Sequence, residues 1–191
     1  IKGLLMNTYI IAEAGVNHNG DIRLARELIL EAKTAGANCV KFQTFLTSEI
    51  MTKSVSLAEY QEANTSNLNG QYELVKSLEL PFEAFRELRN FAEELEIDFL
   101  STPDDIHSLN FLIDELKLSQ IKVGSGEVTN LPFLNVIGSK KVDVILSTGM
   151  SNISEVERAY NILIESGARS VSLLQCTTSY PCPMSDVNLN V

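Results

Sequence analysis

Residues 121–130 read IKVGSGEVTN, and the interpretation of the whole chain starts from this stretch. A short β-branched run that contains Lys122 leads directly into a glycine-rich polar turn with Ser125 and Glu127. Lysine is rarely buried without a partner, and glycine lets a ligand approach the backbone closely. The end of this predicted strand therefore offers an ammonium group, a hydroxyl, backbone amides and a carboxylate to a small anion, a phosphate or a carboxylate. The alternative is an ordinary strand and tight turn, with Lys122 extended into solvent.

The composition of the 191-residue chain is that of one globular domain. Hydrophobic residues make up 45% and charged residues 21%, and the net charge is −10 without a basic run. Nucleic-acid binding needs a lysine- and arginine-rich face, so the sequence predicts no nucleic-acid partner. No apolar run approaches the roughly 20 residues of a membrane span, which predicts no membrane association. The 3 cysteines fit neither a disulfide framework nor a zinc site, and a reducing cytoplasm is the expected location.

Apolar runs of strand length alternate with helical patterns along the chain. One expected strand contains Lys122, and the five others lie at residues 9–13, 38–45, 97–103, 142–149 and 170–177. Helix starts are indicated by an N-cap at Asp21 and by a capping box at Ser154 and Glu157. Residues 46–80 interrupt the alternation, and we expect a functional insertion there, with a short helix at 57–62.

Alternating strands and helices predict a parallel sheet with right-handed crossovers. An open doubly wound sheet builds its site only where the strand order reverses, whereas a barrel brings every strand end to one mouth. Such a barrel needs eight strands, so we interpret residues 1–191 as one α/β domain, a TIM (β/α)8-type barrel truncated after strand six. The barrel is favoured because every predicted strand ends in polar residues: Glu13; Lys41 and Gln43; Ser101 and Thr102; Lys122 and Ser125; Ser147 and Thr148; Gln175 and Thr177.

Each candidate residue has a structural interpretation beside the functional one. Glu13 ends a buried strand and either pairs structurally or takes part in chemistry. Lys41 and Lys122 either clamp an anion or pair with carboxylates such as Glu13 and Glu127. A third interpretation is a Schiff-base lysine, because a buried lysine can lose its proton and become a nucleophile. For Tyr180, beside a proline after the last strand, a packing role competes with a place at the barrel mouth.

Six stretches of the sequence resemble bacterial sialic acid synthases, the family of N-acetylneuraminate, legionaminate and pseudaminate synthases. The stretches follow the family order and cover nearly the whole chain. Each is weak alone, but six in register are specific. They are residues 11–21, 40–45, 101–103, 122–127, 145–150 and 176–181. Residues 183–189 are slightly closer to legionaminate-type members, whereas Gln175 and Thr178 depart from residues that many members have.

The resemblance implies a barrel that condenses phosphoenolpyruvate with an N-acylated amino sugar. The product would be a nine-carbon 2-keto sugar acid, with phosphate leaving by C–O cleavage. The resemblance also implies a divalent metal, Mn²⁺ or Mg²⁺, whose histidine ligands would follow the end of this chain. A C-terminal antifreeze-like domain, absent here, and a homodimer in the full-length protein are implied as well, so this fragment alone would be inactive.

The resemblance assigns roles residue by residue. Phosphoenolpyruvate would be held by Lys41, Thr102, Lys122, Ser125 and Ser147. The sugar or the attacking water would be contacted by Glu13, Gln43 and Tyr180, and Glu127 would lie close to the reacting carbons. Two other functions stay open: a Schiff-base aldolase, and a non-catalytic carbohydrate-binding or structural remnant. His18, between two asparagines, is interpreted as a turn or capping residue rather than a ligand.

Overall fold

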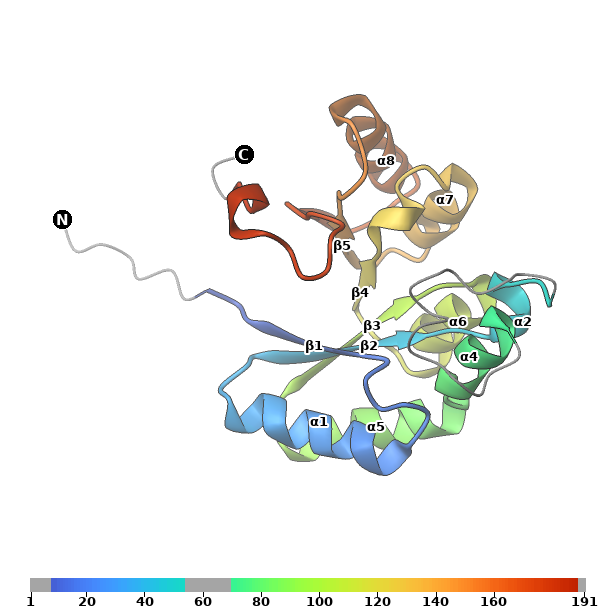
Figure 1. Ribbon diagram of the computed structural model, residues 1–191. Coiled ribbons are helices and arrows are strands. Elements are labelled where there is room, and N and C mark those ends of the chain that lie inside the picture. Colours follow the sequence, from blue (N-terminus) through green and yellow to red (C-terminus); the bar gives the residue numbers. More distant parts are fainter. Residues whose placement is uncertain (1–7, 54–69, 189–191) are drawn as a thin grey trace. The chain divides into compact units, whose positions relative to one another are not determined.

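The computed structural model describes residues 8–53 and 70–188 (Figure 1). The helix expected at 57–62 lies outside these residues. The chain divides into two compact units, Ile1–Leu100 and Ser101–Val191.

The first unit is built around a three-stranded sheet in the order β1-β2-β3, in which β1 and β2 are parallel. Helices α1 and α5 lie side by side along one face of this sheet (Figure 1). Two shorter helices, α2 and α4, follow β2 in the chain. The bounds are β1 Ile11–Gly15, α1 Ile22–Thr34, β2 Cys39–Thr44, α2 Thr47–Ile50, α4 Gln71–Leu78, α5 Phe82–Glu94 and β3 Asp98–Pro103.

The core of the first unit follows from the periodicity of its elements. Helices α1 and α5 each bury residues three or four positions apart, and their hydrophobic stripes are Ala25, Ile29 and Ala32, and Phe85, Leu88 and Ala92. In β2, Phe42 is fully buried and stacks on Phe99 of β3, with ring centroids 5.6 Å apart. Alternation along the strand turns Lys41 and Gln43 to the opposite face. The apolar face of β2 thus fixes where its polar face points.

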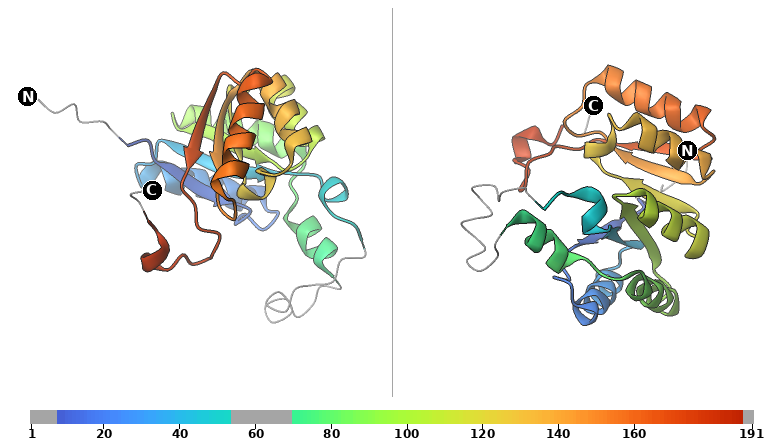
Figure 2. Two further views of the ribbon diagram at one scale, coloured as in Figure 1. Left: turned by 90° about the horizontal axis from the view of Figure 1, so that it is seen from above. Right: turned by 90° about the vertical axis from the view of Figure 1, so that its right-hand side faces the viewer.

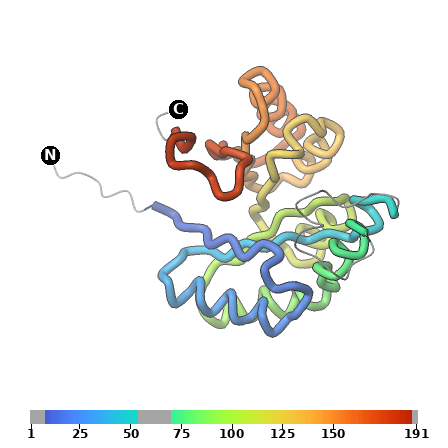
Figure 3. The backbone as a smooth tube through the Cα atoms, viewed as in Figure 1, coloured from blue at the N-terminus to red at the C-terminus, as the bar shows by residue number. Residues whose placement is uncertain are grey.

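The second unit contains another three-stranded parallel sheet, in the order β4-β5-β6. Helices α7 and α8 pack against each other beside it, and the tube in Figure 3 follows the chain through each crossover (Figures 2 and 3). The elements are α6 Ile106–Asn110, a π-helical turn Phe111–Glu115, β4 Gln120–Val123, a 3-10 turn Ser125–Glu127, α7 Leu131–Ser139, β5 Asp143–Ser147, α8 Ile153–Glu165, β6 Ser170–Leu174 and a second 3-10 turn Met184–Asp186.

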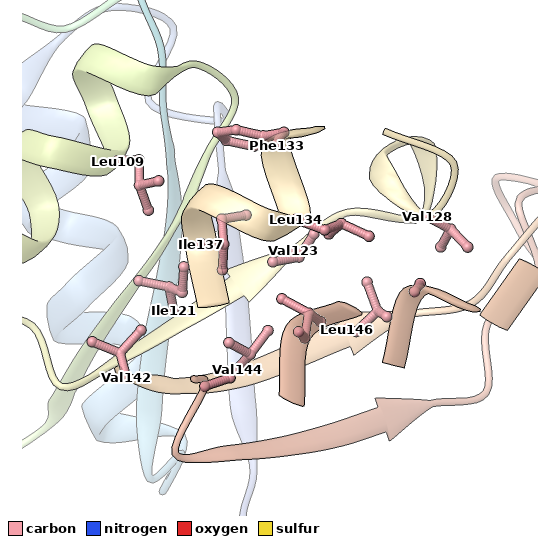
Figure 4. Close-up of a cluster of buried hydrophobic side chains, with 13 residues drawn as sticks. Leu109, Ile121, Val123, Val128, Phe133, Leu134, Ile137, Val142, Val144 and Leu146 are labelled. Carbon is pink, nitrogen blue, oxygen red and sulfur yellow. The ribbon is translucent and has the colours of Figure 1, made fainter. Parts of the chain in front are cut away.

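A cluster of buried aliphatic side chains holds the second unit together (Figure 4). Ile121 and Val123 of β4 and Val144 and Leu146 of β5 project toward α7, which contributes Leu134 among others. Burying an aliphatic side chain of this size contributes about 1.5–3 kcal/mol relative to exposure. Because Ile121 and Val123 both face this cluster, Lys122 between them must face the other side of the sheet.

The structure confirms the α/β class, the parallel sheets and the expected strands. The N-cap at Asp21 is also confirmed, since its side chain accepts a hydrogen bond from the Arg23 amide. The capping box predicted at Ser154 and Glu157 is wrong. Asn152 is the N-cap of α8 and forms the box with Glu155, while the Ser154 hydroxyl donates to the Asn152 side chain. Asparagine caps at least as well as serine, so the earlier residue begins the helix.

Candidate active site

Glu13 and Lys41 lie side by side on neighbouring parallel strands. Their Cα atoms are paired in the register of β1 and β2, and Lys41 Nζ lies 2.7 Å from Glu13 Oε2. The Lys41 side chain is 8% exposed and that of Glu13 is 58% exposed. One of the two structural pairings predicted for Lys41 is therefore confirmed. The geometry leaves a buried ammonium group beside a carboxylate that solvent or a ligand can reach.

A β-bulge interrupts the ladder immediately after this ion pair. Glu13 is opposite Lys41, but the next paired residue, Gly15, is opposite Phe42, so Ala14 is the extra residue. Bulges next to sites re-aim side chains and end strand pairing. Here the bulge ends β1 and starts the loop that leads to α1. Gln43 is half-buried two residues after Lys41, on the same face of β2.

His18 lies in this loop and is buried. Its Nδ1 accepts a hydrogen bond from the Gly20 amide at 3.1 Å, and its ring centroid lies 6.1 Å from that of Phe42. Burial disfavours the imidazolium ion and lowers the pKa of His18 below its usual value. The contacts are those of a neutral turn residue, in agreement with the sequence interpretation.

One carboxylate joins the two ends of the segment between β2 and α5. Glu79 Oε2 accepts hydrogen bonds from the Thr47 amide at 2.8 Å and from the Thr47 hydroxyl at 2.6 Å. Burial alone would raise the pKa of Glu79, but the hydrogen bonds from Lys76 and Thr47 outweigh it and lower the pKa. This contact joins the first residue of α2 to the end of α4, and nothing in the local sequence pattern predicted it.

In the second unit, Lys122 is buried near the end of β4. Its ammonium group donates hydrogen bonds to the Val123 carbonyl, at 2.9 Å, and to the Ser147 hydroxyl of β5. The interpretation in which Lys122 extends into solvent is therefore wrong. The reason is the sheet itself, which pairs Lys122 with Ile145 and so places Ser147, two residues further along, on the same face.

The glycine-rich turn after β4 contains two further polar side chains of the second unit, Ser125 and Glu127, each with a hydrogen-bond partner. Ser125 Oγ accepts a hydrogen bond from the Gly149 amide at 2.9 Å. Glu127 Oε2 accepts one from the Asn130 side chain at 2.7 Å. The sequence predicted Ser125 and Glu127 but missed Gly149 and Asn130. A glycine is not a candidate by its own chemistry, and its contact here spans 24 positions of the chain.

The two remaining predicted residues differ in their surroundings. Thr102 is buried in β3, next to the fully buried Ser101. Tyr180 is 91% exposed and precedes a cis proline in the loop after β6. A packing role for the Tyr180 ring inside this chain does not fit that exposure. The ring is accessible to a ligand or to another part of the protein.

Across residues 8–53 and 70–188, no three histidine, cysteine, aspartate or glutamate side chains cluster so that they could hold a metal ion. Within the same residues, no helix has both the length and the apolar character needed to cross a bilayer. The polar groups found near the strand ends are ammonium, hydroxyl, amide and isolated carboxylate groups. The ammonium, hydroxyl and amide groups can donate hydrogen bonds to an anion or to a carbonyl oxygen.

Parallel strands whose carboxyl ends carry lysine and serine side chains define an α/β protein with groups suited to a small anionic ligand. The chain belongs to the NeuB family, whose model matches residues 28–191.

Relatives of known name agree with this assignment. The chain is 46% identical to the N,N'-diacetyllegionaminic acid synthase of Campylobacter jejuni over 97% of its own length and 56% of that protein. It is 45% identical to the synthase of the same name from Legionella pneumophila, over 98% of its own length and 54% of that protein. The chain thus spans about half the length of these relatives.

A solved structure shares the fold. The crystal structure of N-acetylneuraminic acid synthetase from Leptospira borgpetersenii, in complex with citrate, superposes with a TM-score of 0.79 and 32% identity. The match covers 98% of this chain and 63% of that one.

Proposed function

We propose that the protein containing this chain condenses phosphoenolpyruvate with an N-acylated amino sugar. The products are a nine-carbon 2-keto sugar acid and phosphate. The observation that carries the proposal is the pair of buried lysines, Lys41 in β2 and Lys122 in β4, in a member of the NeuB family. Phosphoenolpyruvate carries a phosphate and a carboxylate, and buried ammonium groups bind both strongly.

The proposal gives each predicted residue a task. Lys41, Thr102, Lys122, Ser125 and Ser147 hold the phosphate and carboxylate of phosphoenolpyruvate. Gln43 and Tyr180 contact the sugar, and Glu127 lies near the reacting carbons. The fold that accompanies this proposal is a TIM (β/α)8-type barrel, of which this chain supplies six strand units as one domain.

The reaction forms one C–C and one C–O bond and breaks the C–O bond to phosphate, while the protons of water pass to the former aldehyde oxygen and to the departing phosphate. The enol carbon of phosphoenolpyruvate attacks the aldehyde carbon of the sugar, and positive charge develops at the carbon that bears the phosphate. Water adds to this carbon, and the C–O bond to phosphate then breaks. The carboxylate of Glu13 is suited to stabilise the positive charge or to take the proton from water. Its 2.7 Å ion pair with Lys41 orients it, and its 58% exposure leaves it accessible.

The relatives support this choice of substrates. The Leptospira borgpetersenii synthetase was crystallised with citrate, a polycarboxylate anion. The two relatives described above as about 45% identical are synthases of N,N'-diacetyllegionaminic acid. We therefore propose a diacetylated amino sugar of the legionaminate type as the substrate to test first.

A divalent metal, Mn²⁺ or Mg²⁺, belongs to the proposal for the whole protein. The residues described here do not form its site. Its histidine ligands are proposed to lie outside this chain. A cytoplasmic homodimer completes the proposal.

The decisive experiment follows the bridging oxygen of phosphoenolpyruvate. Full-length protein is incubated with an N-acylated amino sugar, a divalent metal and phosphoenolpyruvate carrying ¹⁸O in the C–O–P bridge. C–O cleavage predicts that all of the label leaves with phosphate and that the sugar acid gains its new oxygen from water. Label retained in the sugar acid, or no phosphate release with any N-acylated sugar, would refute the proposed reaction.

The Schiff-base alternative is tested by replacing phosphoenolpyruvate with pyruvate and adding borohydride. An aldolase uses pyruvate, releases no phosphate and forms an imine that borohydride reduces to a stable adduct. Lys41 is held in an ion pair with Glu13, whereas a Schiff-base lysine must present an uncharged amine. We therefore expect no covalent adduct after borohydride treatment.

A further inference from the structure

Gly149 lies where three segments of the second unit converge. It follows β5, it is buried, and its amide donates to Ser125 Oγ of the turn after β4. The third segment is the loop after β6, which carries Cys176 and Thr178. A side chain on Gly149 would place its first carbon 2.3 Å from Thr178 Oγ1, 3.0 Å from Ser125 Oγ and 3.5 Å from the Cys176 carbonyl.

The need for glycine at this position is one of space. Gly149 does not have a positive φ, so its backbone conformation is open to any residue. The 2.3 Å approach to Thr178 is shorter than any real contact of a side-chain carbon, and the 3.0 Å approach to Ser125 requires that hydroxyl to move. Gly149 therefore leaves room at the end of β5 for the hydroxyl groups of Thr178 and Ser125, while the Cys176 carbonyl lies at an ordinary contact distance.

The hydrogen bond to Ser125 has a directional consequence. A serine hydroxyl has one hydrogen to donate and two lone pairs that accept. The Gly149 amide occupies one lone pair, at 2.9 Å, and fixes the position of the oxygen. The hydroxyl hydrogen must then point away from Gly149, where it is available to an anionic oxygen.

We propose that Gly149 is a positioning residue, which orients the Ser125 hydroxyl as a hydrogen-bond donor to the phosphate or carboxylate of the substrate. The inference rests on the proposed function, in which Ser125 contacts phosphoenolpyruvate. Because Gly149 has no side chain, the Thr178 hydroxyl can lie next to it, and Thr178 belongs to the loop that carries Tyr180.

The test separates these two effects by first removing the Thr178 hydroxyl. In full-length protein with Thr178→Ala, the Thr178 hydroxyl no longer blocks a side chain at position 149. Adding Gly149→Ala then brings the new methyl group within 3.0 Å of Ser125 Oγ, while the Cys176 carbonyl lies at 3.5 Å, an ordinary contact distance. We expect the KM for phosphoenolpyruvate to rise roughly tenfold relative to Thr178→Ala alone, the loss of one hydrogen bond to a charged group. The KM for the sugar should not change. Gly149→Ala alone should raise both KM values, because it also displaces the loop of Tyr180.

Two further variants make the outcome specific. If Gly149 acts through Ser125, then Gly149→Ala added to Thr178→Ala/Ser125→Ala should have no further effect on the KM for phosphoenolpyruvate. Gly36→Ala is the stability control, because Gly36 has a φ of +81° and open space around it. It should lower the melting temperature and leave both KM values unchanged.

Each outcome is decisive. A wild-type protein that releases no phosphate would overturn the proposed function and this inference together. An active wild type in which Ser125→Ala raises the KM, but Gly149→Ala in the Thr178→Ala background does not, would overturn the inference alone. Additive effects of Gly149→Ala and Ser125→Ala would also overturn it.

Discussion

The two edges of each sheet carry different kinds of polar contact. At the amino ends of the strands, the Tyr9 hydroxyl donates to Asp98, and the Ile10 amide donates to the Asn38 side chain at 2.7 Å. In the second sheet, Asp143 accepts from the Ser170 hydroxyl at 2.7 Å and from Arg169 at 3.2 Å. These contacts join the starts of different strands within each sheet.

The carboxyl ends instead hold buried ammonium groups. Lys41 and Lys122 are buried next to polar partners, Glu13 and Ser147. Charge is costly to bury, and the same sheets stabilise their amino ends with hydrogen bonds and with the partly exposed Asp143–Arg169 ion pair. The difference is consistent with our proposal that the carboxyl ends bind the ligand while the amino ends contribute stability, the division of roles found in barrel enzymes.

Two titratable groups at the amino edge of the first sheet, Cys39 and Tyr9, are held in their uncharged form. Burial raises the pKa of the Cys39 thiol to about 11, although the Tyr9 hydroxyl lowers it. Burial raises the pKa of Tyr9 too, and its hydrogen bond to Asp98 adds to the effect. Neither group is suited to acid–base catalysis near neutral pH.

Replacing Lys122 should have the largest effect on activity. Lys122→Met keeps the length of the side chain and removes its charge, so the kcat/KM for phosphoenolpyruvate should fall by about 10³-fold or more. The melting temperature should change little, because an apolar side chain of similar volume replaces a buried cation at small cost. Steady-state phosphate release and thermal unfolding measure the two effects. Activity near that of the wild type would remove Lys122 from the ligand site.

Ser147→Ala is the matched variant for Lys122. It removes one neutral partner of the ammonium group and leaves the charge in place. Its expected effect is about tenfold in kcat/KM, clearly smaller than that of Lys122→Met.

Replacing Glu13 should have the next largest effect. Glu13→Gln retains an oxygen that can accept from Lys41 but cannot take a proton from water. We expect kcat to fall by about 10²-fold, with the KM for phosphoenolpyruvate nearly unchanged. A rise in this KM without a fall in kcat would mean that Glu13 serves only to position Lys41.

Replacing a residue of the amino edge should give the opposite pattern. Asp143→Ala removes the acceptor for Ser170 and Arg169 and should lower the free energy of unfolding by about 1 kcal/mol. The kcat/KM of the folded protein should equal that of the wild type. Urea unfolding and steady-state kinetics on the same preparation test the contrast. A loss of activity without a loss of stability would show that the amino edge of the sheet also takes part in catalysis.

The sequence predicted the strands, because they depend on local patterns, and it placed candidate polar side chains at the strand ends. Alternation placed Lys41 and Gln43 together, and Asp21 was recognisable as a cap. The Glu13–Lys41 pair was predicted only as one of two alternatives, because its partner depends on the register of two strands. Gly149 and the contact of Thr47 with Glu79 were missed, because close packing and long-range hydrogen bonds leave no periodic signal.

The last prediction concerns His18, and it tests whether a buried polar residue in the loop after β1 contributes to stability rather than to ligand binding. Burial lowers its pKa in the folded protein, whereas the unfolded chain titrates near 6.5. As the pH falls below about 6.5, the unfolded state binds a proton that the folded state resists. The free energy of unfolding should therefore decrease between pH 7 and pH 5, by at most about 1.4 kcal/mol per pH unit.

His18→Asn should flatten this pH dependence while keeping an acceptor for the Gly20 amide. Urea unfolding at pH 5, 6 and 7 measures the slopes. Hydrogen bonding outweighs burial at Glu79 and lowers its pKa, and hydrogen bonding also lowers the pKa of Asp21, so both carboxylates lose most of their contribution to stability below this window, as the pH falls from the ordinary carboxyl values of the unfolded chain. An unchanged slope in His18→Asn would show that the folded protein accepts the proton, and His18 would then be a candidate for proton transfer rather than a turn residue.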